Sequence, residues 1–159
     1  MITTVQATPN DRREKSDRRQ RNDRRKHGDR RKTADILNHK AVIMLVDDSP
    51  INLIIGKNVL SEHYSVATVP SAEKMFGRLK TKSPDMILLD IDMPGMSGYE
   101  AIILLKSKPE TKDIPIIFLS ARSEAVDELK GLCLGAIDYI IKPYHPSILL
   151  KRIEIRLRG

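Results

Sequence analysis

The sequence lacks the features that would place a protein in a membrane or outside the cell. No run of about 18 apolar residues occurs in its 159 residues, so no segment is predicted to span a bilayer. The amino terminus also lacks the apolar stretch of about 7 to 15 residues that a secretory signal requires. Cys133 is the single cysteine and is flanked by leucines, so we expect a small buried side chain in a reducing compartment. These absences favour a soluble, cytoplasmic protein.

A second absence defines the first part of the chain. From Asn10 to Thr33 there is no Ala, Val, Ile, Leu, Met, Phe, Tyr or Trp, so no apolar face offsets the entropy of ordering this segment. Residues 1–40 contain 13 Lys and Arg against 6 Asp and Glu, whereas the remaining residues contain 15 of each. The net charge of +7 therefore belongs to this first part. We expect residues 1–39 to be a disordered basic arm, in which Asp-Arg-Arg repeats, and residues 40–158 to fold.

Several interpretations of the arm are open. Arg-rich segments are often solubilising linkers, and each Asp partly neutralises the neighbouring Arg pair. Alternatively, the arm contacts an anionic partner such as nucleic acid or a membrane surface, without base stacking because it has no aromatic residues. The segment from Arg21 to Arg25 also resembles the Arg-x-x-x-Arg element of cyclic-dinucleotide-binding domains, but the second half of that signature is missing. A further hypothesis is that the Arg pairs bind acidic residues of the folded part and hold it closed.

After Lys40 the sequence changes to five short apolar runs, each followed by a segment with helical spacing or a capping residue. This alternation is typical of an α/β fold with a five-stranded, doubly wound parallel sheet. The predicted strands are residues 41–46, 64–69, 86–89, 116–119 and 137–141, and the predicted helices are 50–59, 71–80, 97–105, 124–134 and 146–157. In the first helix, Ile51, Ile54, Ile55 and Val59 form an apolar side.

Polar residues follow four of the five predicted strands. They are Asp47 and Asp48, then Asp90, then Ser120, then Lys142. In a doubly wound sheet these strand ends meet at one edge. Three carboxylates there would raise one another's pKa values unless they shared a cation, and oxygen ligands suit Mg²⁺. A metal-bound carboxylate beside a lysine and a hydroxyl is suited to phosphoryl transfer, with Asp90 as the nucleophile.

Ordinary structural explanations remain open for the same residues. The Asp47-Asp48 pair alone is compatible with a solvated turn, and Ser120 with an N-cap for the helix that contains Glu124. Tyr139 is compatible with core packing as well as with a moving part. The four histidines are far apart in the sequence and offer no metal-ligand spacing.

Four ordered blocks resemble the response-regulator receiver domains (CheY-like family) of bacterial two-component systems. These blocks are Val46-Asp47-Asp48-Ser49-Pro50, Leu88 to Gly98, Leu119-Ser120-Ala121-Arg122 and Asp138 to Pro143. The resemblance covers Lys40 to Arg158 and implies a flavodoxin-like fold of the receiver type. The implied function is a phosphoacceptor switch rather than an enzyme, and the implied partner is a sensor histidine kinase or a phosphotransfer protein.

The resemblance also implies a metal site around the phosphoacceptor. Asp90 would accept the phosphoryl group, and Asp47, Asp48 and Asp90 would hold Mg²⁺ together with the backbone carbonyl of Asp92. Apart from the resemblance, Met93, Pro94 and Gly95 are best explained as loop geometry beside Asp90, with Gly98 letting the backbone pass closely.

Further implied roles concern the switch. Lys142 would pair with the phosphoryl group and precede a cis peptide bond to Pro143. Ser120 would donate its hydroxyl to a phosphoryl oxygen, and Tyr139 would then turn inward. The face built from the fourth helix, fifth strand and fifth helix would serve output or form a homodimer.

Two other functions remain open. The first is the front piece of a longer regulator with a carboxyl-terminal output enzyme domain, for example one that acts on cyclic di-GMP. It is favoured because the chain stops at Gly159, directly after the last predicted helix, and because Val46 to Leu53 resembles receivers of that kind. The second is a degenerate receiver that acts as a binding module through its basic arm.

Overall fold

The computed structural model describes residues 39–159, so the predicted arm lies outside the described residues apart from His39. Strands and helices alternate along the described part. They are β1 (Val42–Val46), α2 (Pro50–Leu60), β2 (Ser65–Val69), α3 (Ala72–Leu79), β3 (Met86–Asp90), α4 (Gly98–Ser107), β4 (Ile116–Ser120), α5 (Ala125–Cys133), β5 (Asp138–Ile141) and α6 (Pro146–Arg158). The predicted elements all form, with ends that differ by one or two residues.

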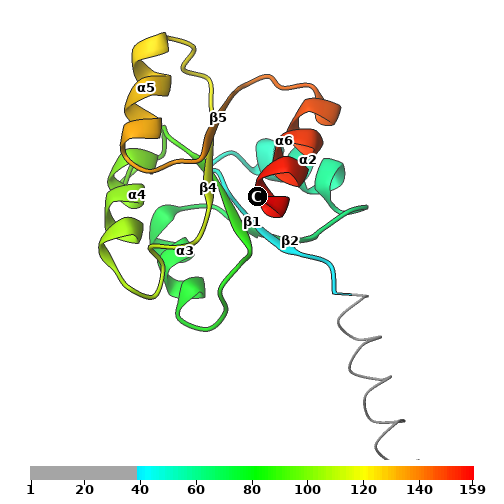
Figure 1. Ribbon diagram of the computed structural model, residues 1–159, viewed down its shortest axis with the longest axis horizontal. Helices are drawn as coiled ribbons and strands as arrows, with labels where there is room; N and C mark the ends of the chain where they lie inside the picture. The colour runs from blue at the N-terminus through cyan, green and yellow to red at the C-terminus, as the bar shows by residue number, and fades with distance from the viewer. Residues whose placement is uncertain (1–38) are drawn as a thin grey trace, which may run out of the picture. The chain divides into compact units, whose positions relative to one another are not determined.

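The five strands form one parallel sheet in the order β2-β1-β3-β4-β5 (Figure 1). The chain moves from β1 outward to β2 and then returns to the other side of β1 for β3. Met44 of β1 accordingly lies opposite Ala67 of β2 on one side and Ile87 of β3 on the other. The strand order therefore reverses beside β1, which confirms the predicted doubly wound sheet and places its ligand-binding edge at the carboxyl ends of β1 and β3.

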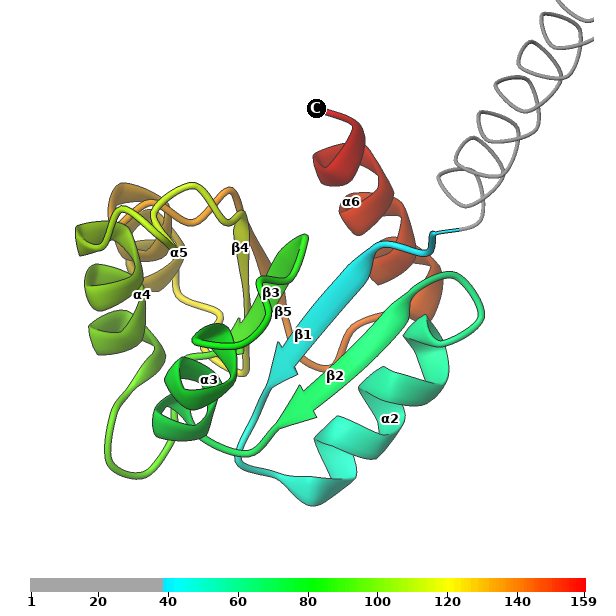
Figure 2. The same cartoon turned by 90° about the horizontal axis from the view of Figure 1, so that it is seen from below.

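Helices cover both faces of the sheet. Helices α2 and α6 lie on one face, and α3, α4 and α5 lie on the other (Figure 2). Successive side chains of each strand point to opposite faces, so Leu88 packs with Leu60 and Ile153 whereas Leu89 packs with Met75. Strands β1, β3 and β4 are buried along their whole length, which explains their continuous apolar sequences.

Serine residues fix the starts of three helices near this edge. Ser49 precedes Pro50 and its Oγ accepts a hydrogen bond from the backbone N of Asn52 at 3.3 Å. Ser71 caps α3 in the same way, and Ser97 forms a capping box with Glu100. Such caps satisfy backbone N–H groups that have no partner inside the helix. They hold the helix starts, and the loops before them, against the carboxyl ends of the strands.

Most of the apolar side of α2 faces solvent. Ile51, Ile54 and Ile55 are 68%, 60% and 50% exposed, because α2 packs through Leu60 and Gly56 instead. A Cβ on Gly56 would lie 2.5 Å from Leu45 Cδ2, so the helix approaches β1 closely along its glycine side. Cys133, expected to be buried, is exposed.

Helix α5 has the same kind of contact with the sheet. It packs through Gly131, where a Cβ would lie 2.9 Å from the ring of Phe118. The residues that follow Gly131 are therefore turned toward solvent, and Leu132 is 41% exposed.

Among residues 39–159, none of the helices combines the length and the apolar character needed to cross a membrane.

Candidate functional site

Side chains from four strand ends converge at the carboxyl edge of the sheet. Asp47 follows β1, Asp90 is the last residue of β3, Ser120 is the last residue of β4, and Lys142 follows β5. One carboxylate oxygen from each of Asp47, Asp48 and Asp90 lies within 4.8 Å of the others. The structure therefore brings together the residues that the sequence placed at one edge.

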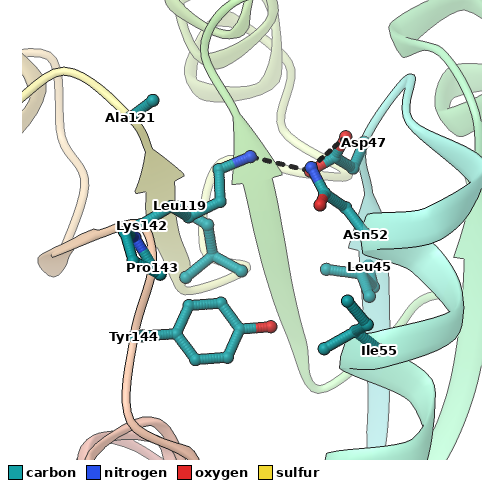
Figure 3. A pocket seen from close by; sticks show the side chains of 9 residues that line it. All are labelled: Leu45, Asp47, Asn52, Ile55, Leu119, Ala121, Lys142, Pro143 and Tyr144. Carbon is teal, nitrogen blue, oxygen red and sulfur yellow. Dashed lines mark hydrogen bonds and ion pairs between the residues drawn. The ribbon is translucent and has the colours of Figure 1, made fainter.

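Lys142 lies among these carboxylates. Its Nζ is 2.8 Å from Asp47 Oδ2 and 3.3 Å from Asp90 Oδ1. Figure 3 shows the Lys142 side chain extending from the far side of a cavity toward Asp47. Asp47 and Asp90 are 2% and 6% exposed, whereas Asp48 is exposed. Two buried carboxylates thus share one ammonium group, and the third is open to solvent.

This environment changes the proton affinity of the buried groups. Burial raises the pKa of Asp90 to about 6, although the charge of Lys142 acts in the opposite direction. Burial alone would lower the pKa of Lys142, but its hydrogen bond to Asp47 and the charge of Asp90 outweigh this effect and raise it. Lys142 therefore carries a positive charge near neutral pH. Asp90 loses its proton less readily than a carboxyl group in water does, because burial disfavours its charged form.

The donor set suits a hard divalent cation. The cluster offers three carboxylates, and hard ions such as Mg²⁺ prefer oxygen ligands and bind through one or two carboxylates with several waters. Exposed Asp48 leaves a side of the cluster accessible, and three carboxylates facing one lysine leave an excess of negative charge. The residues present therefore fit Mg²⁺, with Asp47, Asp48 and Asp90 as candidate ligands.

Asp92 contributes differently from these three residues. Its carboxylate is bound by the guanidinium of Arg122, with Nη2 at 2.7 Å and Nε at 3.1 Å from Oδ1. The hydrogen bonds from Arg122 lower the pKa of Asp92. The carboxylate of Asp92 is therefore engaged by Arg122, and a metal contact through the backbone carbonyl of Asp92 stays a prediction of the resemblance.

The two predicted switch residues meet at Arg122. Ser120 is fully buried, and its Oγ accepts a hydrogen bond from the backbone N of Arg122 at 3.1 Å. Tyr139 is 4% exposed and donates its hydroxyl to the carbonyl of Arg122 at 2.9 Å. Tyr139 is thus already turned inward, with its ring near Phe118. Ser120 belongs to β4 and the N-cap of α5 is Glu124, so the capping explanation for Ser120 was wrong.

The loops around Asp90 depend on special backbone geometry, as expected. Gly98 N donates to the carbonyl of Ile91 at 2.8 Å, and a Cβ on Gly98 would lie 2.8 Å from Ile91 Cα. Gly95 adopts a φ of 76°, which side chains disfavour. The peptide bond between Lys142 and Pro143 is cis, as the resemblance implied.

Asn52 and Arg122 contact the site but were not predicted as site residues. The Asn52 side chain donates to both carboxylate oxygens of Asp47, at 3.2 Å and 3.4 Å. Asn52 lies in the first helical turn after the Asp47-Asp48 pair, which was the available sequence signal. Arg122 stands two residues after Ser120, but its partner Asp92 is distant in sequence, and no local pattern indicates the pair.

The arrangement can support nucleophilic attack by a carboxylate on a phosphoryl group. Asp90 offers the nucleophilic oxygen, and Lys142 is placed to neutralise charge on an oxygen of the transferred group. Ser120, at the end of the neighbouring strand β4, carries a hydroxyl that can donate a further hydrogen bond. The chemistry requires little beyond this positioning and charge neutralisation.

Comparisons with known proteins agree with this geometry. The family model described as "Response regulator receiver domain" matches residues 43–154. A protein of Vibrio cholerae serotype O1 named "Probable cyclic di-GMP phosphodiesterase" is 39% identical over 76% of this chain and 27% of its own length. The phosphate regulon transcriptional regulatory protein PhoB of Rhizobium meliloti is 33% identical over 74% of this chain and 52% of its own length.

Among solved structures, one similar chain is the signal receiver domain of a signal transduction histidine kinase from Syntrophus aciditrophicus. The two align with a TM-score of 0.69 and 32% identity, over 75% of this chain and 91% of that one. This chain therefore spans nearly all of that isolated domain, but only about a quarter to a half of the two curated relatives described above.

Proposed function

This chain belongs to the response regulator receiver domain family, and from that premise we propose that Asp90 accepts a phosphoryl group from a phosphohistidine of a sensor histidine kinase or phosphotransfer protein. The observation that carries the proposal is the position of Asp90. Its buried carboxylate ends the central strand, 3.3 Å from Lys142 and beside two further aspartates. Receiver domains of two-component response regulators act as switches through such a site.

The proposed transfer moves one phosphoryl group between two nucleophiles. An oxygen of ionised Asp90 forms a bond to phosphorus while the bond from phosphorus to the histidine nitrogen breaks, and that nitrogen keeps the electron pair. The Lys142 ammonium stabilises negative charge on a phosphoryl oxygen, and the Ser120 hydroxyl donates to another. Bound Mg²⁺, held by Asp47, Asp48, Asp90 and the carbonyl of Asp92, would supply further neutralisation of the phosphoryl charge.

In the proposed switch, phosphorylation of Asp90 changes the conformation of the segment around Arg122. Ser120 now accepts a hydrogen bond from Arg122 N, so a rotation of its hydroxyl toward a phosphoryl group would alter that contact. Tyr139 binds the carbonyl of the same residue, which couples it to any shift of Arg122. The expected result is a change of the face formed by α5, β5 and α6.

Mass spectrometry tests the phosphoacceptor directly. The chain and its Asp90→Asn variant are incubated with Mg²⁺ and acetyl phosphate, and their intact masses are compared. We expect a gain of one phosphoryl group in the unmodified chain alone. No gain in either chain would favour the degenerate receiver, whose function lies in contacts. A gain in both would place the acceptor at another residue.

A homodimer through α5, β5 and α6 is the proposed assembly. Apolar side chains are exposed on this face, including Val126 at 70%, Leu129 at 61% and Ile141 at 42%. Burying them in a symmetric contact would be favourable. Light scattering before and after treatment with beryllofluoride, with Leu129→Glu as the disrupting variant, tests this proposal. A monomer under both conditions would contradict it.

The remaining predictions concern the rest of the protein. Contact of residues 1–39 with an anionic partner, and a cytoplasmic location, stay predictions. Deleting residues 1–39 should abolish partner binding while phosphorylation persists if the arm is a binding element. An alternative is that the chain belongs to a longer regulator with an output enzyme domain that acts on cyclic di-GMP, as the name of one relative suggests. Sequencing the reading frame beyond Gly159 would show whether such a domain is encoded.

A further inference from the structure

Asn52 is the neutral side chain that holds the buried carboxylate of Asp47. Its Nδ2 lies 3.2 Å from Asp47 Oδ2 and 3.4 Å from Oδ1, so the amide faces both oxygens (Figure 3). The backbone N of Ser49 donates to Oδ1 at 2.9 Å, and Lys142 Nζ donates to Oδ2 at 2.8 Å. The Asp47 carboxylate is therefore held by donors on both of its oxygens.

These three donors differ in how well each can keep the Asp47 carboxylate in one orientation during phosphoryl transfer. Lys142 also binds Asp90, and the proposed reaction draws its charge toward the phosphoryl group. Ser49 contacts only Oδ1 and therefore leaves the carboxylate free to rotate about that contact. Asn52 faces both oxygens and comes from the capped start of α2, which is a rigid element. It is thus the donor placed to keep the plane of the carboxylate fixed when Lys142 is engaged elsewhere.

On the basis of the proposed function, we propose that Asn52 is a positioning residue that orients Asp47 toward Mg²⁺ and thereby sets the metal affinity of the domain. A metal-ligating carboxylate is usually oriented by a hydrogen bond from a neighbouring residue. Loss of such a partner typically weakens metal binding by about 10- to 100-fold. The distances of 3.2 Å and 3.4 Å favour the lower end of that range.

The surroundings of Asn52 make its truncation a usable test. Asn52 borders a cavity of about 350 Å³, which is also lined by Ile55, Pro143 and Tyr144 (Figure 3). Because the side chain is only partly buried, an alanine leaves no closed void in the core. The backbone N of residue 52 still donates to Ser49 Oγ in the variant, so the start of α2 is retained. We therefore expect Asn52→Ala to fold.

The experiment compares the full chain with Asn52→Ala and with Asn58→Ala. Asn58 is an exposed asparagine of the same helix, two turns from the site, and controls for the loss of an amide from α2. Mg²⁺ binding is measured by titration calorimetry at constant pH and ionic strength. We expect the dissociation constant to rise about 10-fold in Asn52→Ala and to stay unchanged in Asn58→Ala.

The Mg²⁺ dependence of phosphorylation by acetyl phosphate gives a second readout. In Asn52→Ala the Mg²⁺ concentration for half-maximal rate should rise by the same factor, while the rate at saturating Mg²⁺ stays within about two-fold of the unmodified chain. A residue that only supported the fold would not separate these two quantities. Thermal unfolding of the two variants without metal checks that both are folded.

Several results would overturn the inference. Equal or tighter Mg²⁺ binding by Asn52→Ala would do so even if Asp90 is phosphorylated normally. An unchanged dissociation constant with a lower saturating rate would also do so, because it would place Asn52 in the chemical step. An unmodified chain without Mg²⁺ affinity would remove the basis of the inference. Weaker Mg²⁺ binding by Asn52→Ala in a chain that gains no phosphoryl group would instead support the inference and refute the proposed function.

Discussion

Replacing Asp90 by asparagine is expected to stabilise the metal-free domain at pH 8. Asp90 is 6% exposed, and burial raises its pKa from 3.8 to about 6. Its carboxylate therefore ionises less readily in the folded chain than in the unfolded chain. Asparagine has nearly the same shape but carries no charge, so the variant avoids this cost.

The size of the effect follows from the pKa difference. A shift of about two pKa units corresponds to about 3 kcal/mol between the two protonation states. The asparagine amide also brings N–H groups close to Lys142, which reduces the gain. We therefore expect the variant to exceed the unmodified chain by about 1 to 3 kcal/mol in free energy of unfolding at pH 8.

The pH dependence has a definite sign. Since the folded-state pKa of Asp90 is the higher one, its contribution to stability is fully present below pH 3.8 and is lost as pH rises through about 6. The advantage of Asp90→Asn should accordingly be smaller at pH 5 than at pH 8, by about 1 to 1.5 kcal/mol. Urea unfolding in the presence of a chelator, at both pH values, measures this difference.

Added Mg²⁺ should offset most or all of the stability advantage of Asp90→Asn over the unmodified chain. Mg²⁺ at about 100 times its dissociation constant stabilises a folded protein by about 2.7 kcal/mol, and the unmodified chain retains all three carboxylates. A metal-free variant that is less stable than the unmodified chain at pH 8 would refute the reasoning. A difference that does not vary between pH 5 and pH 8 would also refute it, because its origin would not be the ionisation of Asp90.

Other substitutions test the neighbouring contacts. Lys142→Ala should slow phosphorylation by acetyl phosphate on the order of 100-fold at saturating Mg²⁺, and a mass-spectrometric time course at an unchanged rate would contradict this. Gly98→Ala should destabilise the domain by about 1 to 3 kcal/mol, because the added Cβ would crowd the backbone of Asp90 and Ile91. Gly77→Ala, whose Cβ meets nothing within 4 Å, should instead stabilise the domain by about 0.5 to 1 kcal/mol in thermal unfolding. Tyr139→Phe removes a buried hydrogen bond and should cost about 1 kcal/mol in urea unfolding; equal stability would exclude that contribution.

The sequence predicted the parts of the site that depend on strand ends. Asp90 and Ser120 close apolar runs, and those runs become fully buried strands because both faces of the sheet are covered. Ser49 with Pro50 marks the start of α2, and Ser97 marks the start of α4, through local hydrogen bonds that a short segment specifies. Local chemistry of this kind is visible in a single sequence.

The contacts that were missed depend on tertiary packing. Arg122 binds Asp92 because the loops after β3 and β4 lie side by side, and nothing near either residue in the sequence indicates this pairing. The exposure of Ile51 and Ile54 follows from the rotation of α2 about its axis, which the contact of Gly56 with Leu45 determines. Apolar spacing predicts that a helix has a buried face, but close helix-to-sheet contact at glycine decides which one.

The central position of β3 has a consequence for the timing of signalling. This strand is hydrogen-bonded to β1 on one side and to β4 on the other. Backbone amides in such a strand exchange with deuterium only through nearly complete opening of a domain, whereas loops exchange through small local fluctuations. A phosphoryl group on Asp90 would therefore be attached to the part of the domain that opens last. A conformational change that starts at Asp90 would then spread through the surrounding loops. These loops fluctuate on a shorter time scale than the strand that carries the phosphoryl group.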